Sequence, residues 1–516
     1  MKRLIKIDYL PITIALFIAL GFMVYFLTVS PLWVDEAVEY FYSKVMIGSI
    51  PGEDSTNMYQ RICSTFQPPL YNVVMYVWLS IYDTEWWYRL FGVIVTLIGG
   101  IAMYKSVNLL VNNKLWSSVS MLIYLLTPFM FEYALECAEY NLMLCFDAWS
   151  VFYFLKSIIN GRFKDYALYF LFAVLAVYSQ YGAAILEVVL FTVLFIDVIR
   201  RKDSVLLKDF LKCSIVTIVF AAVPLIFFFM IPQMENQGTL SVSHNLVLAH
   251  DNILIDLIYC IRVCIATIFR AWNIPFQIFI VITLSIAIIA FATKKNKLRI
   301  ILLCSFFAMW ILYYLLVAFS LYGYNDFALK FGTENIGRRY MLFTLPLFFL
   351  IYLVGLYKIP TLFPDKWHKT SLFGTVFVSL LLLAWSIRQQ YMARDFQKDD
   401  VKNAVMLWFS KTDKSIPTYV HDWQYFNFLF YLSHNDDYSQ IMSDKVIKIN
   451  IPTQNYHQIE SRLGDKSAFQ YKRFYLVMSE HRNNYTEFLK VLSENEYSYT
   501  YLYDETTKLL LVEKNE

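Results

Sequence analysis

The sequence is poor in charge, and it is also poor in glycine and proline. Only 16% of its 516 residues are charged, with 15 glycines and 14 prolines. A soluble protein of this length carries about 25% charged residues, so the composition excludes an ordinary soluble domain. The net charge of +3 is too small to indicate nucleic-acid binding. No internal repeat or low-complexity segment is present, and the frequent Lys, Asn and Ile are typical of an AT-rich bacterial genome.

Cysteine is also scarce, with seven residues in the chain. No spacing among them resembles a zinc site. Most lie in or near apolar segments, where cysteine behaves as a small hydrophobic residue. Cys63 and Cys137 both fall on the predicted outer side of the membrane, where a disulfide between them is possible but is not established by spacing.

Long apolar runs dominate the rest of the chain, which is 58% hydrophobic and 18% aromatic. Runs of about twenty apolar residues indicate membrane-spanning helices. The first follows a basic N-terminus, and it is too long for a signal peptide and lacks a cleavage site, so we expect a retained anchor. The sequence predicts about eleven spans: 9–29, 88–111, 115–131, 139–158, 165–180, 183–199, 213–232, 274–292, 300–321, 340–357 and 371–388.

Lysine and arginine gather in alternate loops, which the positive-inside rule assigns to the cytoplasm together with the N-terminus. Arg200 to Lys202 and Lys294 to Arg299 are two such clusters. Residues 69–82 are apolar but too short to span, and a span there would invert every later basic loop. We therefore expect 69–82 to lie on the outer surface, and 251–272 to form an outer-surface or re-entrant helix. The C-terminus is then extracytoplasmic.

The composition becomes polar after Arg388, which divides the chain into a membrane domain, 1–390, and a C-terminal extracytoplasmic domain, 391–516. The second domain has the patterns of a small α/β fold. They predict an amphipathic helix at 399–409, a buried strand at 474–478 and a hairpin with strands 497–503 and 508–513.

An acidic pair, Asp35-Glu36, follows the first span in the first outer loop, 30–87. An isolated pair of this kind usually lies in a solvated loop and has no further role. Here other carboxylates, arginines and aromatic residues gather on the same predicted side of the membrane, whereas the cytoplasmic loops are plainly basic. This group includes Gln67, Tyr71, Arg89, Glu136, Tyr140, Gln180, Arg338 and Arg339.

Several short motifs on this predicted side occur along the chain in the order that is typical of a known family. Asp35-Glu36-Ala37, Gln67-Pro68-Pro69-Leu70-Tyr71, Trp87-Tyr88-Arg89-Leu90-Phe91-Gly92, the segment 133–140 and Arg339-Tyr340 occur in this order. The set resembles the GT-C glycosyltransferases, in particular the branch of protein O-mannosyltransferases and lipid A aminoarabinose transferases. Two positions depart from that pattern, since Ala138 replaces a common arginine and Gln180 a common histidine.

The resemblance implies an inverting transferase that moves a sugar from polyprenyl phosphate to a lipid, glycan or protein acceptor on the outer face. Because phosphate leaves without protonation, one carboxylate suffices as general base, and the family motif assigns that role to Asp35. Glu36 either positions a substrate or is structural. Arg89 and Arg339, with Arg338 as a further candidate, are expected to bind the donor phosphate.

Other roles remain open at this point. Gln67 and Tyr71 are expected to contact the phosphate or sugar, unless their segment only fixes a turn. Glu136, beside Tyr140, is either a partner of the active site or an ion-pair partner of an arginine. No metal is required if arginines carry the phosphate charge, although Asp35, Glu36 and Glu136 are suitable ligands for a divalent ion.

Three alternative functions also fit a polytopic chain. A transporter or flippase usually has ionisable groups near the bilayer midplane, and here Asp147 and Glu187 are the chief candidates within the spans. A polysaccharide ligase or polymerase would share an outer-face site. A catalytically inactive GT-C scaffold is compatible with the departures at Ala138 and Gln180.

Overall fold

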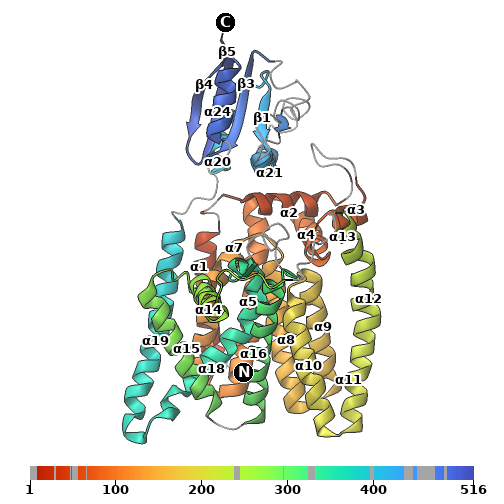
Figure 1. Ribbon diagram of the computed structural model, residues 1–516, viewed down its shortest axis with the longest axis vertical. Coiled ribbons are helices and arrows are strands. Elements are labelled where there is room, and N and C mark those ends of the chain that lie inside the picture. Colours follow the sequence, from red (N-terminus) through yellow and green to blue (C-terminus); the bar gives the residue numbers. More distant parts are fainter. Residues whose placement is uncertain are drawn as a thin grey trace, which may run out of the picture. The chain divides into compact units, whose positions relative to one another are not determined.

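The computed structural model of the protein describes residues 9–27, 29, 31–46, 48, 56–65, 67–236, 245–293, 296–322, 332–394, 400–434, 446–449, 471–480 and 485–515 (Figure 1). The chain forms two compact units. The helical unit comprises Met1–Phe26, Tyr59–Val74 and Tyr88–Met392. The mixed unit comprises Leu27–Met58, Met75–Trp87 and Ala393–Glu516. The first outer loop is therefore divided between the two units.

Every apolar run predicted to span contains a helix. The helices of the helical unit are α1 (Leu10–Phe26), α3 (Met58–Cys63), α5 (Glu85–Val111), α6 (Lys114–Leu126), α7 (Pro128–Leu135), α8 (Tyr140–Asn160), α9 (Phe163–Ser179), α10 (Ala183–Arg201), α11 (Ser204–Thr217), α12 (Val223–Leu225), α13 (Ile231–Asn236), α14 (Ile253–Phe269), α15 (Ile274–Ala292), α16 (Lys297–Ala318), α18 (Leu345–Lys358) and α19 (His368–Arg394). The helix α4 (Leu70–Ile81) begins in this unit and ends in the mixed unit.

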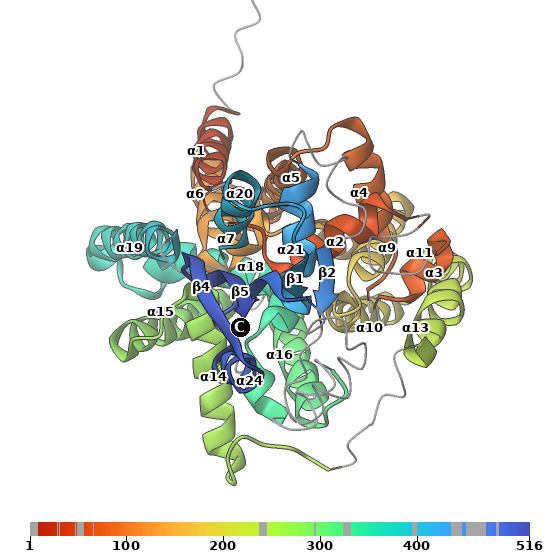
Figure 2. The ribbon, with the colours of Figure 1, turned by 90° about the horizontal axis from the view of Figure 1, so that it is seen from above.

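Seven helices within the described residues are long and apolar enough to cross a membrane. The number is eight if α6 and α7, which meet at a bend of 64°, count as one span. Because α1 and α9 have only 17 residues each, they fall below this length, and eleven spans remains a prediction. α14 runs crosswise to helices such as α9 and α11, since Figure 1 shows it end-on and Figure 2 from the side. This orientation agrees with the prediction that 251–272 does not span.

Close packing around α18 holds the centre of the helical unit. Nearly all of this helix is buried, and it packs against α15 at Gly355. A side chain on Gly355 would press on the Ala287 carbonyl, with the Ala287 carbonyl carbon 2.7 Å and its Cβ 2.9 Å away. Glycine therefore permits the two helix backbones to approach each other, as small residues do in membrane helix packing.

The mixed unit contains α2 (Val34–Lys44) and a five-stranded sheet in the order β2-β1-β3-β5-β4. β1 pairs in parallel with β2 and β3, whereas β5 pairs antiparallel with β3 and β4. A buried cluster that includes Phe474, Leu476 and Leu492 forms its core. The elements are α20 (Val401–Lys411), β1 (Thr418–His421), α21 (Asp422–Ser433), β2 (Val446–Ile449), β3 (Arg473–Ser479), α24 (Tyr485–Glu494), β4 (Tyr497–Asp504) and β5 (Thr507–Lys514).

The predicted fold class is therefore confirmed: a membrane protein of apolar helices with a small C-terminal α/β domain. The expected helix at 399–409 is α20, the expected buried strand is β3, and the expected hairpin is β4–β5.

Gly355→Ala should lower the free energy of unfolding by about 1–3 kcal/mol, because the new methyl group overpacks the contact with α15. Gly374→Ala in α19 is the control, since nothing lies within 4 Å of its added Cβ. The control should be neutral or stabilising by up to about 1 kcal/mol. Thermal unfolding in detergent measures both, and equal midpoints for the two variants would contradict the packing argument.

Candidate functional site

Asp35 and Glu36 lie in the first turn of α2, where negative side chains interact favourably with the helix dipole. The Trp33 N–H donates to Glu36 Oε2 at 2.7 Å, and Glu36 is fully buried. Glu36 therefore satisfies a backbone donor at the start of its own helix, which is a structural role, and a role in positioning a substrate stays a prediction. Asp35 is partly buried.

A polar cluster fixes the other end of α2. Tyr40 Oη donates to Asp83 at 2.9 Å, the Lys44 ammonium lies 2.7 Å from the same carboxylate, and His434 Nε2 lies 3.5 Å from it. Burial alone would raise the pKa of Asp83, but the hydrogen bonds from His434, Lys44 and Tyr40 outweigh it and lower the pKa to about 2. These contacts join α2, the turn before α5 and the C-terminal domain within the mixed unit.

The second acidic loop lies in the helical unit between α7 and α8. Glu136 ends α7, Tyr140 begins α8, and both side chains are buried. Tyr88 Oη of α5 donates to the Cys137 carbonyl at 3.2 Å. A Cβ on Gly92 would lie 2.6 Å from the Ala134 carbonyl oxygen, so α5 approaches this loop closely.

Arg89 is next to Tyr88 on the same helix, and only 3% of its surface is exposed. The sequence grouped Arg89 with polar residues on the predicted outer side, whereas the structure packs it within the protein. α5 begins at Glu85, three residues before the predicted span 88–111, so Arg89 lies in its second turn.

Arg339 begins a short 3-10 helix that leads into α18. Its guanidinium carbon lies 5.8 Å from the ring centres of both Tyr140 and Tyr340. The structure thus brings Arg339 together with Tyr140, two residues separated by about half of the membrane domain. Arg338 is exposed.

Gln67 and Tyr71 take part in the packing of the helical unit. The Gln67 backbone carbonyl accepts a hydrogen bond from Gln233 Nε2 at 2.8 Å. Tyr71 is buried, and its ring lies edge-on to Phe91 at 6.3 Å. Both observations support a role in fixing the turn.

Gln233 is a residue that the sequence did not single out. Its amide also donates to the Ile62 carbonyl at 3.0 Å, and Tyr181 Oη donates to Gln233 Oε1 at 2.7 Å. The available signal was an amide side chain directly after a long apolar run. Gln180, in turn, accepts from the Gly182 N–H at the start of α10, which is a local structural role.

The candidate residues divide between the two units. Asp35 and Glu36 belong to the mixed unit, and the others belong to the helical unit: Gln67, Tyr71, Arg89, Glu136, Tyr140, Arg338 and Arg339.

All seven cysteines are free thiols, so a disulfide between Cys63 and Cys137 is not formed. Cys63 Sγ instead lies 3.9 Å from the Phe228 carbonyl oxygen. Within the described ranges, no group of three or more His, Cys, Asp or Glu residues is placed to hold a metal ion.

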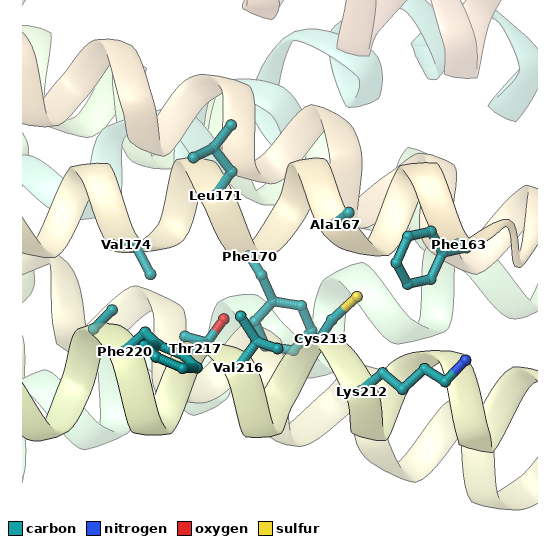
Figure 3. A pocket seen from close by; sticks show the side chains of 11 residues that line it. Phe163, Ala167, Phe170, Leu171, Val174, Lys212, Cys213, Val216, Thr217 and Phe220 are labelled. Atoms are coloured by element: carbon teal, nitrogen blue, oxygen red, sulfur yellow. The ribbon is translucent and has the colours of Figure 1, made fainter.

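An apolar groove of about 340 Å³ lies between α9 and α11 (Figure 3). Phe170, Leu171 and Val216 are among its lining residues, and Lys212 lies at one end of the row. None of the candidate site residues lines it. The groove is suited to an aliphatic chain.

Comparison with known proteins gives two kinds of similarity. Residues 66–228 match the family model described as dolichyl-phosphate-mannose-protein mannosyltransferase. ArnT from Cupriavidus metallidurans bound to undecaprenyl phosphate is 11% identical, with a TM-score of 0.58 over 97% of each chain. The apo state of ArnT from the same organism is 12% identical, with a TM-score of 0.56 over 97% of each chain. A search of curated proteins found no match. The chain thus shares the fold of ArnT, as the GT-C resemblance predicts.

Asp83→Asn should destabilise the protein at neutral pH and do so less in acid. The folded pKa of about 2 is below the ordinary value of 3.8, so the stabilisation is complete above pH 4 and is lost as pH falls toward 2. Because the Asp83 side chain is 34% exposed, solvent screening reduces the expected contribution to about 1 kcal/mol.

Thermal unfolding of wild type and Asp83→Asn at pH 7 and pH 3 measures this difference. Glu513→Gln is the control, because its ion pair with Arg473 is exposed on both sides and should contribute little at either pH. A destabilisation by Asp83→Asn that grows as pH falls would exclude this account.

Proposed function

We propose that the protein is an inverting membrane glycosyltransferase that moves a sugar from polyprenyl phosphate to a lipid, glycan or protein acceptor. The observation that carries the proposal is the family match over 66–228, which contains Gln67, Tyr71, Arg89, Glu136 and Tyr140. The fold shared with ArnT over almost the full chain supports it, since one ArnT structure holds undecaprenyl phosphate.

Asp35 acts as the general base. It accepts the proton of the acceptor hydroxyl or amine while the acceptor atom bonds to the anomeric carbon and the bond from that carbon to the phosphate oxygen breaks. Polyprenyl phosphate departs with the bonding electrons, and the anomeric configuration inverts. The position of Asp35 in the first turn of α2 supports this role, because the helix dipole favours a negative charge there.

Arginine side chains neutralise the negative charge of the departing phosphate. Arg339 is the best-supported candidate because it is partly exposed and lies near the rings of Tyr140 and Tyr340. Planar guanidinium groups bind phosphate oxygens through paired N–H donors. Arg89 contributes positive charge from within the unit, and Arg338 is the further candidate. On this account the reaction requires no metal ion.

We place the reaction and the C-terminal domain on the extracytoplasmic face of a bacterial plasma membrane, because the dense lysine and arginine loops are then cytoplasmic. The alternative functions are a lipid or sugar transporter and an inactive scaffold. Single-turnover transfer from undecaprenyl phosphate carrying a series of sugars tests the proposal against both, since neither alternative releases undecaprenyl phosphate. A purified chain that binds these donors but transfers none of the sugars would exclude the proposed function.

Arg339→Ala should weaken binding of undecaprenyl phosphate by about 1.5–3 kcal/mol, or roughly 10- to 100-fold, through loss of a charge-assisted contact. Arg339→Lys should recover part of the loss, because it keeps the charge but not the planar fork. Arg388→Ala is the control, since Arg388 also lies over an aromatic ring, that of Trp385. Equal binding by Arg339→Ala and wild type would remove Arg339 from the phosphate site.

Asp35→Asn should lower turnover by about 10²–10⁴-fold, because the amide keeps the size of the side chain but cannot take the proton. Binding of undecaprenyl phosphate should persist or tighten, since a nearby negative charge is lost. Single-turnover transfer and donor binding are measured separately. Near wild-type turnover would assign the base elsewhere, with Glu136 as the next residue to test.

A further inference from the structure

The segment that leads into α2 is held by the C-terminal domain. The Leu32 N–H donates to Tyr431 Oη at 2.6 Å, and the Leu32 carbonyl accepts from Asn427 Nδ2 at 2.7 Å. Leu32 is fully buried, and Asn427 is almost so. The two contacting side chains lie four residues apart on α21, so they point from the same face of that helix. One helix of the C-terminal domain thus forms hydrogen bonds with the peptide groups on both sides of Leu32.

The hydrogen bonds continue from Leu32 into the first turn of α2. The Trp33 N–H donates to Glu36, and the Trp33 carbonyl accepts from the Ala37 N–H at 3.0 Å. Each backbone polar group of Leu32 and Trp33 therefore has a defined partner. Asp35 lies between Trp33 and Glu36, and its backbone cannot shift without breaking at least one of these bonds.

Side-chain packing prevents α2 from sliding along α21. The Phe41 ring lies 5.9 Å from Phe426, and the Tyr40 ring meets Phe430 edge-on at 4.7 Å. His434, directly after α21, joins the cluster around Asp83 described above. α21 thus contacts α2 through both ring pairs.

We propose that Asn427 and Tyr431 are positioning residues that hold the Asp35 carboxylate in its catalytic orientation. The inference rests on the proposed function, in which Asp35 is the base. A base must lie within hydrogen-bond reach of the proton that it accepts, and a displacement of about 1 Å lowers a rate roughly 10²-fold. The C-terminal domain therefore acts on turnover through the backbone at Leu32, without itself touching the substrate.

Tyr431→Phe and Asn427→Leu test this role, because each removes one hydrogen bond and keeps most of the side-chain volume. Tyr431→Phe also loses a 3.4 Å contact with Glu85, which retains its ion pair with Lys402. We expect kcat to fall about 10- to 100-fold, with unchanged KM for the sugar donor and unchanged affinity for undecaprenyl phosphate.

Tyr485→Phe is the matched control. It removes another tyrosine hydroxyl of the mixed unit, one that donates to Tyr501 Oη at 2.6 Å. Both tyrosines are distant in sequence from α2 and α21. Its kcat should equal that of wild type. A fall in kcat as large as that of Tyr431→Phe would overturn the inference, because any loosening of the domain would then suffice.

A double variant separates positioning from general destabilisation. In an Asp35→Asn background, Tyr431→Phe should lower the residual rate no further, because no base remains to be positioned. A full additional loss would overturn the inference. A double variant whose rate equals that of Asp35→Asn alone supports the inference, because the two effects are then non-additive.

Hydrogen exchange supplies a readout that does not depend on activity. The amides of residues 32–36 should exchange faster in Tyr431→Phe than in wild type or Tyr485→Phe. Exchange at the wild-type rate overturns the inference and leaves the proposed function intact. Wild-type turnover by Asp35→Asn instead overturns the assignment of the base, so the two failures are distinguishable.

Discussion

The backbone at Leu32 and Trp33, just before α2, is held by side chains rather than by regular secondary structure, and the placement of the acidic motif depends on this. Backbone N–H and C=O groups that are buried must find partners. At Leu32 and Trp33 they find Tyr431, Asn427 and Glu36. The first turn of α2 begins from this anchor. The same residues thus supply hydrogen-bond partners for the buried backbone groups and define where the Asp35 carboxylate can act.

Two tyrosine rings lie close to Arg339. Tyrosine rings interact with the faces of a guanidinium group, whereas its N–H donors point outward in the plane of the group. The Tyr140 and Tyr340 rings lie at equal distances from the Arg339 guanidinium carbon, so both rings help to place this side chain.

Local patterns in the sequence predicted much of the fold. The apolar runs correspond to helices, and the alternation around residues 504–507 corresponds to the β4–β5 hairpin. β1 has only four residues, Thr418–His421, which is too short for a recognisable period. α21 was missed because half of its residues are aromatic and its sequence shows no clear polar face.

The candidate site was less predictable because its supports are distant in sequence. Tyr431 contacts a residue 399 positions earlier, and no local period encodes that pairing. The burial of Arg89 was also missed, because it depends on the approach of α5 to the loop at Ala134, which Gly92 permits. The capping role of Glu36 had a local signal, a glutamate at the third helical position, but the start of α2 was not predicted.

Asp147 and Glu187 bear on the choice between catalysis and transport. Both are buried in the helical unit, on α8 and α10, and Ser150 Oγ donates to Glu187 Oε1 at 2.5 Å and lies 2.9 Å from the Asp147 carbonyl oxygen. Such a bond joins two neighbouring helices, and interhelical polar contacts of this kind stabilise membrane bundles. Transport would require these groups to be reached from each side in turn. A hydrogen bond that fastens α8 to α10 opposes the helix movement that such access needs, so Glu187 is better explained as a structural link between these two helices.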